Sequence, residues 1–409
     1  NCWLLNGYYA DSNFIELFYC LPEVFSPINE IASRVADATW QLRKDWNDEV
    51  DYSNQQFNRL FSKPNALMSF KQMVYQAVCY ELTTGKEFFF ANIPDALPFE
   101  LASVVSWWNL PAQNTCIDKK KGVDPYSTTE LSDFILRYTI PQNGGRRVFT
   151  PEKVLPMCNL SLFEGNDITC TASPLLGAEK AIKNLIPVYE ARGMIYIKRG
   201  VMGFVVSRKG DESGQIPLTK GEKEELQRDF YHTKGITGNR DPITVTSQPV
   251  DFVKTSMSIS EMQPFDETLA DAITIYRVLR VPRHLVPSKD NSTFANASQD
   301  MKTFYSEVII PWAQRYAEAW TSFFRLPEQR RYINADFSHV DVLQENRKEK
   351  AEVDAINGKT FLQAWQNGAC TLNDWIVGRG DKKVANSLYE KRIFEMTPEE
   401  IETVKNAIN

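Results

Sequence analysis

Apolar residues recur at helical spacing in two long segments of the middle third of the chain. Ser173-Pro174 is typical of one helix start, and the capping sequence at 260–263 is typical of another. Each stripe covers about twenty residues, which measure roughly 30 Å as a helix. We therefore expect residues 173–193 and 259–280 to form an antiparallel helix pair. The side chains expected to pack between the helices are Ile182, Leu185, Leu269, Ile273 and Tyr276.

Residues 194–258, which separate these two helices, have the pattern of a β-rich insert. Short apolar runs bounded by turn residues predict strands, and a capping box predicts one charged helix among them. The expected elements are strands at Met194–Lys198, Gly203–Ser207, Pro242–Thr246 and Val250–Lys254, a hairpin tip at Gly210–Gly214, and a helix from Thr219 to Gly235.

Residues 1–172 combine both kinds of pattern, which predicts a mixed α/β region. A helix is expected to begin with Ser26 as its N-cap and Pro27 as its first residue, and another to occupy Phe70–Leu82 before Gly85. Four apolar runs separated by turn residues then predict an antiparallel sheet. These runs are Glu87–Asn92, Ser103–Trp108, Phe134–Ile140 and Arg147–Phe149.

The last part of the chain is expected to be mainly helical. Residues 299–334 carry the strongest periodic stripe of the sequence, and Pro311 predicts a bend near its middle. Residues 335–409 are expected to form charged helices, with a break at Gly368 and new starts at Thr371 and Thr397. The chain as a whole therefore belongs to the α+β class.

A basic loop, residues 281–298, is expected between the second helix of the pair and the long bent helix. No acidic residue occurs from Arg277 to Lys289. The loop has two interpretations: a solvated basic surface loop, or a loop placed where a polyanion passes. Its candidate DNA-facing residues are Arg280, Arg283, His284 and Lys289, and Pro282 and Pro287 are expected to limit its flexibility.

Composition limits the classes of function. The net charge of −6 argues against a protein that coats nucleic acid with its whole surface. The seven cysteines form no C-x-x-C pair, which favours reduced thiols in a cytoplasmic setting. The sequence has no Lys or Arg in its first 33 residues and no apolar run long enough to span a membrane, so we expect neither a signal peptide nor a membrane partner.

Catalytic and metal-binding motifs are missing from the sequence. Lys359-Thr360 completes only half of a P-loop, because Val353 stands where the first glycine is required. The three histidines, His232, His284 and His339, are at least 52 residues apart. We therefore expect no metal site, no cofactor and no catalytic residues. Carboxylates such as Asp133 and Glu164 cannot be paired from sequence alone, so a carboxylate- or metal-dependent hydrolase or nuclease stays an alternative, as does an adaptor that forms no ring.

The order of several short motifs resembles the portal proteins of tailed bacteriophages, in particular the family members with short subunits. Each motif alone is weak, and their collinear order from about residue 28 to 380 carries the resemblance. Asp374 departs from the family's usual Glu. The motifs are Leu60-Phe61-Ser62-Lys63-Pro64-Asn65 with Ser69-Phe70, Gly85-Lys86-Glu87-Phe88, Ser173-Pro174-Leu175, Val281-Pro282-Arg283-His284-Leu285, Val308-Ile309-Ile310-Pro311-Trp312 and Asn367-Gly368-Ala369-Cys370-Thr371-Leu372-Asn373-Asp374.

The resemblance implies a structural subunit of a ring, commonly of twelve copies, at one vertex of a phage or prophage capsid. It implies a wing at 1–172, a two-helix stem at 173–193 and 259–280, a clip at 194–258, a tunnel loop at 281–298, a long wing helix at 299–334 and a crown at 335–409. The implied partners are other copies of the chain, the terminase large subunit, neck proteins, a capsid or scaffold protein, and weakly held double-stranded DNA. The implied location is the virion, with the host cytoplasm during assembly.

Overall fold

In the computed structural model the chain folds into two compact units, each with its own buried core. Unit 1 comprises residues 1–36, 62–99 and 103–292, and unit 2 comprises residues 37–61, 100–102 and 293–409. The structure describes residues 11–46, 48–124, 127–142, 144–162, 168–197, 203–208, 210–211, 214–233, 250–254, 264–282, 285–286, 294–344, 356, 359–360, 363–365, 367–378 and 387–400.

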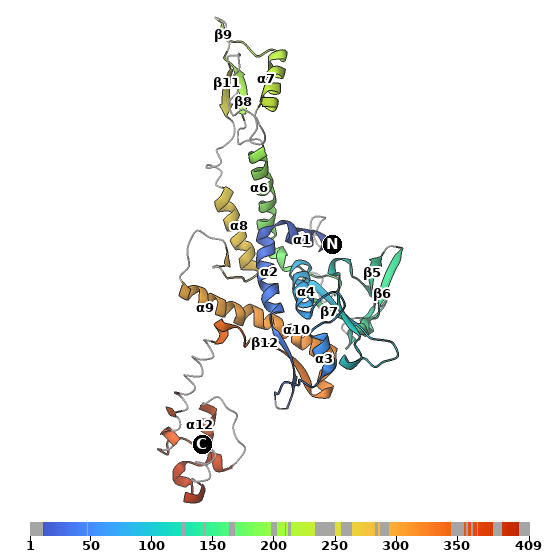
Figure 1. Cartoon of the computed structure of the whole chain (residues 1–409), viewed down its shortest axis with the longest axis vertical. Helices are drawn as coiled ribbons and strands as arrows, with labels where there is room; N and C mark the ends of the chain where they lie inside the picture. The colour runs from blue at the N-terminus through green and yellow to red at the C-terminus, as the bar shows by residue number, and fades with distance from the viewer. Residues whose placement is uncertain are drawn as a thin grey trace. The chain divides into compact units, whose positions relative to one another are not determined.

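Helices and two antiparallel sheets form the first part of unit 1 (Figure 1). One sheet has the strand order β3-β2-β7 and the other has the order β4-β5-β6. Their shared core includes Phe88 of β2 and Tyr138 of β5, whose rings are 5.7 Å apart. The sequence correctly predicted antiparallel pairing here, but it predicted one sheet from four runs, whereas the structure has two sheets and adds the unpredicted strands β4 and β7. The elements are α1 (Asp11–Cys20), α2 (Pro22–Ala36), α4 (Phe70–Thr84), β2 (Lys86–Asn92), β3 (Ser106–Leu110), β4 (Cys116–Lys119), α5 (Leu131–Phe134), β5 (Ile135–Gln142), β6 (Gly145–Phe149) and β7 (Val154–Cys158).

Helix α4 shows how local sequence fixes both ends of an element. The Ser69 hydroxyl accepts the N–H of Gln72, and the Gln72 side chain accepts the N–H of Ser69, which completes a capping box. At the other end Gly85 adopts the left-handed region with φ 75°, and its N–H donates to the carbonyl of Glu81. The predicted helix and its stop at Gly85 are confirmed.

The predicted start of helix α2, with Ser26 as its N-cap, is wrong. Helix α2 begins at Pro22, so Pro27 lies inside it instead of at its first position. The N–H groups of Val24 and Phe25 already donate to the carbonyl of Leu21. Val24 is fully buried, so burial favours an additional turn, and Pro22 itself supplies the residue that suits a helix start.

The segment expected as a β-rich insert contains paired strands and one helix in its described part. Strand β8 (Gly203–Ser207) pairs antiparallel with β11 (Val250–Lys254), and the short strands β9 (Gly210–Asp211) and β10 (Gly214–Gln215) form the predicted hairpin. Helix α7 (Lys220–Thr233) begins as predicted, because the Glu222 carboxylate accepts the N–H of Thr219 at 2.9 Å. The strand predicted at Met194–Lys198 is wrong, since helix α6 continues to Ile197 and does not stop at Gly193. The strand predicted at Pro242–Thr246 lies outside the described residues.

Unit 2 packs a helix against a two-stranded antiparallel sheet. Strand β1 (Thr39–Lys44) pairs with β12 (Arg331–Asp336), and α10 (Ile310–Phe323) covers the pair. Trp320 of α10 is fully buried, with its ring 4.7 Å from Trp40 and stacked on Tyr316 at 5.4 Å. Unit 2 also contains α3 (Gln55–Leu60), α9 (Phe294–Phe304) and the 3₁₀ turn η8 (Leu326–Gln329).

The long helix of unit 2 is interrupted by a π-helical turn rather than by a simple bend at proline. The turn occupies Tyr305–Ile309 between α9 and α10, and Pro311 lies in the first turn of α10. Proline lacks an N–H and its ring clashes with the carbonyl four residues earlier, which here belongs to Glu307 inside the π turn. The helix also begins at Phe294, so residues 294–298 are helical although the sequence predicted a loop there. The predicted end near residue 334 is wrong as well, because α10 ends at Phe323 and residues 331–334 belong to strand β12, which pairs with β1.

The described part of the C-terminal region forms a small cluster around Trp365, Leu372, Ile376 and Met396. The predicted helix start at Thr371 is confirmed by reciprocal hydrogen bonds between Thr371 and Asp374, which precede α12 (Leu372–Gly378). Two 3₁₀ turns follow, η9 (Ser387–Glu390) and η10 (Ile393–Glu395). Most of the helix predicted at 344–365 lies outside the described residues. Among the described helices, none combines the length and apolar character that a membrane span requires.

Candidate assembly and channel site

Two contacting antiparallel helices occupy the segments where the sequence predicted a pair. The 3₁₀ turn η5 (Pro174–Ala178) leads into α6 (Glu179–Ile197), and both pack against α8 (Pro264–Val278) (Figure 1). Gly177, at the start of the first segment, lies against Val278 at the end of α8. A Cβ atom added to Gly177 would lie 3.2 Å from Cγ1 of Val278. The absence of a side chain at Gly177 therefore lets the two segments approach closely.

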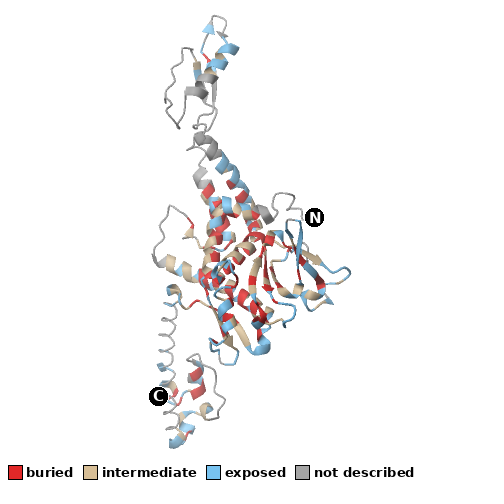
Figure 2. Cartoon of the chain, turned by 45° about the vertical axis from the view of Figure 1, so that its right-hand side comes forward, coloured by how far each residue is buried: buried red, intermediate tan, exposed pale blue. Residues whose placement is uncertain are grey.

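The buried face of α8 is displaced by one residue from the predicted stripe. Both helices of the pair carry buried residues (Figure 2). Ile182, Leu185 and Tyr276 are buried as expected, whereas Leu269 and Ile273 are only half-buried. Ala272 and Ile275 are buried in their place. Tyr276 is buried in both cases, so the inner face is turned by less than the about 100° that separates adjacent helical residues. Three of the four residues from Ile273 to Tyr276 are apolar. The sequence alone therefore could not decide which of them face the partner helix.

Helix α2 contacts α8 and adds a third element to this helix pair. The Tyr189 hydroxyl on α6 donates a 2.6 Å hydrogen bond to Oε1 of Glu23 on α2. Burial raises the pKa of Tyr276, while a hydrogen bond with Ser26 acts in the opposite direction. Tyr276 therefore stays neutral across the physiological pH range, which suits a side chain that is only 2% exposed.

The chain leaves α8 through a Schellman motif, the six-residue hydrogen-bonded ending in which one residue is left-handed. The N–H of Val281 donates to the carbonyl of Tyr276 at 2.9 Å, and the N–H of Arg280 donates to that of Arg277 at 3.0 Å. Arg280 is the left-handed residue, with φ 57°, and Val281 is buried. This hydrogen-bonded ending sets the direction in which the basic loop begins.

Only part of the predicted basic loop belongs to the described residues. Arg280 is exposed, Pro282 is half-buried and Val286 is buried, and the N–H of Leu285 donates to the carbonyl of Pro282 at 3.1 Å. Val281 and Val286 thus anchor the two sides of a short turn. The remaining candidates, Arg283, His284, Pro287 and Lys289, lie outside the described residues.

The described ionisable residues do not assemble a hydrolytic site. Glu81 and Glu87 are fully buried, and burial together with repulsion from Glu81 raises the pKa of Glu87 well above its ordinary value. Burial also raises the pKa of the Cys79 thiol to about 12, which keeps it protonated and poorly nucleophilic at neutral pH. No group of three His, Cys, Asp or Glu side chains within the described part of the chain is arranged to hold a metal ion.

The other candidate residues predicted from the sequence are dispersed. Asp133 lies exposed on α5, Glu164 is outside the described residues, and His339 is 3.2 Å from Asp37 in unit 2. What the fold supplies is an antiparallel helix pair, a paired-strand segment between its two helices, and a basic segment that follows it.

A family model for phage portal proteins matches residues 22–375. The chain belongs to the phage portal protein family. The match covers the helix pair, the segment between its helices, the basic loop and the long interrupted helix. Portal proteins of this family are structural and not catalytic, so this chain is a structural portal subunit of the capsid vertex and not an enzyme. The resemblance seen in the sequence is confirmed.

Solved structures support the portal fold. The portal chain is similar to a chain from the neck of an empty gene transfer agent particle computed with C6 symmetry, with a TM-score of 0.61, 16% identity, and coverage of 91% of this chain and 94% of that one. A chain from the native particle's neck, computed with C12 symmetry, has a TM-score of 0.60 at 16% identity over 91% and 94% of the two chains. An HK97-family portal protein from Corynebacterium diphtheriae has a TM-score of 0.53 and 10% identity, with 80% of this chain and 95% of that one covered. A search of the curated proteins gives no match.

Proposed function

We propose that this portal subunit assembles into a closed ring of twelve copies through which the genome is packaged and ejected. The family match carries the proposal. The similar chain from the native gene transfer agent neck comes from a structure computed with C12 symmetry, which supports the number of subunits. A ring of identical subunits needs two different, mutually complementary faces on each copy.

The helix pair is proposed as the stem of each subunit, with η5 and α6 (residues 174–197) as its first helix and α8 (residues 264–278) as its second. Residues 198–258 are then the clip, residues 294–323 the long wing helix and residues 337–409 the crown. The paired strands β8 and β11 and helix α7 support a folded clip. We propose the clip as the docking surface for the terminase large subunit and later for neck proteins, and the wing as the contact for capsid or scaffold protein. Assembly would take place in the host cytoplasm.

The basic loop is proposed as the tunnel loop, with its bounds shortened to residues 281–293 because α9 begins at Phe294. The Schellman motif at Arg280 and the buried side chains of Val281 and Val286 support a loop whose base is held firmly. A conduit must not hold DNA strongly, because phosphate contacts from Lys and Arg give tight, salt-dependent binding. A subunit with a net charge of −6 and one short basic loop meets that requirement.

Reversing the charge of the loop tests this proposal. The double variant Arg283→Glu, Lys289→Glu is expected to reduce the amount of DNA packaged or retained, most clearly at low salt, because two attractive contacts with phosphate become repulsive. Packaged DNA is measured by quantitative PCR on nuclease-treated particles at several salt concentrations. The matched control is Arg146→Glu, Arg147→Glu on strand β6, which changes the net charge equally. Packaging equal to that of the parent at every salt concentration would refute the tunnel-loop assignment.

A further inference from the structure

Four described residues other than glycine have a left-handed backbone, and three of them are arginines. Arg280, Arg325 and Arg330 have φ angles of 57°, 53° and 52°, and the fourth residue, Asp48, has φ 55°. A side chain with a Cβ atom is strained in this region, and glycine removes the strain. An arginine at such a position carries backbone strain that glycine would avoid, which points to a role for its side chain.

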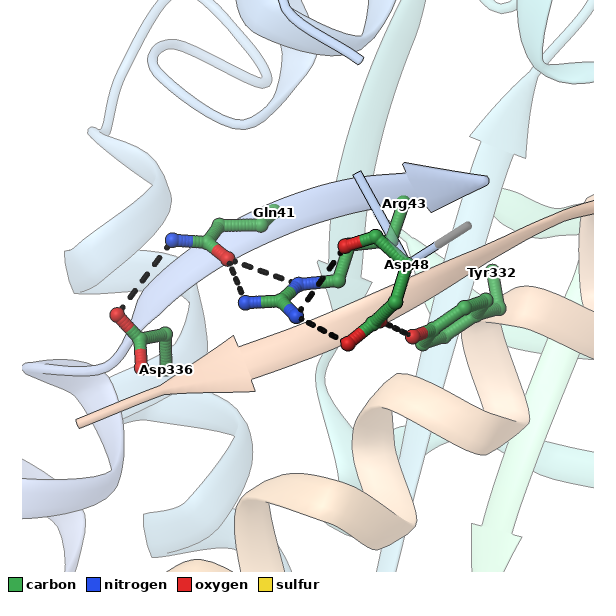
Figure 3. Close-up of polar contacts among 5 residues, drawn as sticks. All are labelled: Gln41, Arg43, Asp48, Tyr332 and Asp336. Carbon is green, nitrogen blue, oxygen red and sulfur yellow. Dashed lines mark hydrogen bonds and ion pairs between the residues drawn. The ribbon is translucent and has the colours of Figure 1, made fainter. Parts of the chain in front are cut away.

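The side chain of Asp48 supplies its own reason (Figure 3). Its carboxylate accepts a 3.0 Å hydrogen bond from Arg43 and another from the hydroxyl of Tyr332. These contacts, led by that from Tyr332, lower the pKa of Asp48. Gln41 extends the group by contacting both Arg43 and Asp336. The local contacts of this carboxylate thus offset its backbone strain.

Arg325 and Arg330 show no such compensation. They lie immediately before and after the 3₁₀ turn η8 in unit 2, and both side chains are exposed. Neither guanidinium has a hydrogen-bond or ion-pair partner among the described residues, whereas the next arginine, Arg331, pairs with Asp51 at 2.8 Å. Glu328 lies within η8, and the backbone of Asp45 is hydrogen-bonded to Arg330. Both acidic side chains are exposed, and neither forms an ion pair with the guanidinium of Arg325 or Arg330.

Exposed aromatic residues lie beside these arginines. The N–H of Asp45 donates to the carbonyl of Arg330 at 2.9 Å, which brings the segment containing Trp46 to η8. The Trp46 side chain is 61% exposed, and Tyr52, which follows Asp51, is 78% exposed. Trp, Tyr and Arg are the residues enriched at energetic hot spots of protein–protein interfaces. Asp51 in turn pairs with Arg331, which places the Tyr52 backbone next to the same segment. We call the four exposed residues Trp46, Tyr52, Arg325 and Arg330 the η8 patch.

We propose that the η8 patch binds a carboxylate-bearing surface of a second copy of this chain, as one of the two complementary faces of the ring. Guanidinium groups form bidentate, charge-assisted hydrogen bonds with carboxylates. A closed ring needs a complementary face on the next copy, and each copy carries 52 Asp and Glu residues that can supply carboxylates to that face. The exposed aromatic residues favour a protein surface over DNA. The inference rests on the proposed ring.

The test exploits the backbone strain. In the double variant Arg325→Gly, Arg330→Gly, strain is removed and charge is lost together, so the thermal midpoint of the subunit is expected to stay level or rise while assembly falls at least tenfold at equal concentration. Assembly is measured by light scattering after size exclusion, with the full chain at several salt concentrations. The charge-preserving control Arg325→Lys, Arg330→Lys is expected to keep most of the assembly at low salt. Asp48→Gly is expected to lower the thermal midpoint without preventing assembly, because its carboxylate is anchored locally.

The possible outcomes separate this inference from the ring itself. A parent that stays monomeric contradicts the ring and, with it, the inference. If the parent forms a ring and the glycine variant forms an equally abundant ring, the role of the η8 patch is overturned while the ring itself stands. A glycine variant that loses assembly together with its thermal midpoint shows a structural role and also overturns it. Loss of binding to a short DNA duplex in a mobility-shift assay, with assembly unchanged, would assign the patch to DNA instead.

Discussion

Replacing Ile275 with Ala is expected to lower the free energy of unfolding of unit 1 by about 2–5 kcal/mol. Ile275 is fully buried on α8, a helix that packs against η5, α6 and α2. The substitution removes three carbon atoms from this close-packed contact, and the cavity left behind adds to the lost transfer free energy. Denaturant unfolding followed by circular dichroism measures the loss as a lower midpoint with an unchanged slope.

Ile273 provides a matched control on the same helix. It is the same residue type, two positions away, and is only half-buried. Ile273→Ala is therefore expected to cost less than half as much as Ile275→Ala, since less apolar surface leaves water when this side chain folds. Equal losses for the two variants, or a larger loss for Ile273→Ala, would contradict the inner face assigned to α8.

Gly85→Ala is also expected to destabilise unit 1, by about 2–5 kcal/mol, for two separate reasons. The left-handed φ of 75° strains any residue with a Cβ atom. In addition, the new Cβ would lie 2.3 Å from the carbonyl oxygen of Ala172, a backbone atom that cannot rotate away. The thermal midpoint and the denaturant midpoint should both fall.

Gly122→Ala separates these two causes. Gly122 has nearly the same φ, 76°, and a Cβ atom there would meet nothing within 4 Å. The control is therefore expected to show only the backbone strain, about 1–2 kcal/mol. If Gly85→Ala cost no more than Gly122→Ala, the close approach of the chain at Ala172 would not be a structural constraint.

Elements with local signals could be predicted from the sequence. The capping box at Ser69, the stop at Gly85 and the reciprocal bonds at Thr371 are set by residues within three or four positions of one another. Such signals predicted the extent of α4 and the start of α12, but they failed where burial or helix continuation prevailed, as at Gly193, which α6 passes. At Pro22, for example, burial of Val24 extended the helix beyond the local signal at Pro27.

Features that depend on distant parts of the chain could not be predicted in the same way. Strands β1 and β12 pair although almost 300 residues separate Thr39 from Asp336. Neither strand has a turn signal that points to the other. The left-handed arginines were also missed, because Arg is not a residue type that indicates a positive φ. The basic segment that contains the candidate channel residues could be read from the sequence. The structure adds the hydrogen-bonded end of α8 at Arg280, where this segment begins.

The mass of the assembled chain tests the central claim most directly. Size exclusion with multi-angle light scattering on the full-length protein, over a range of concentrations, is expected to show a closed species of about twelve subunit masses, the number that the C12 neck structure supports. The mass should be constant across the peak and independent of loading, because a closed ring does not grow further. A mass that stays at one subunit at every concentration, or rises continuously as in an open filament, would contradict the ring.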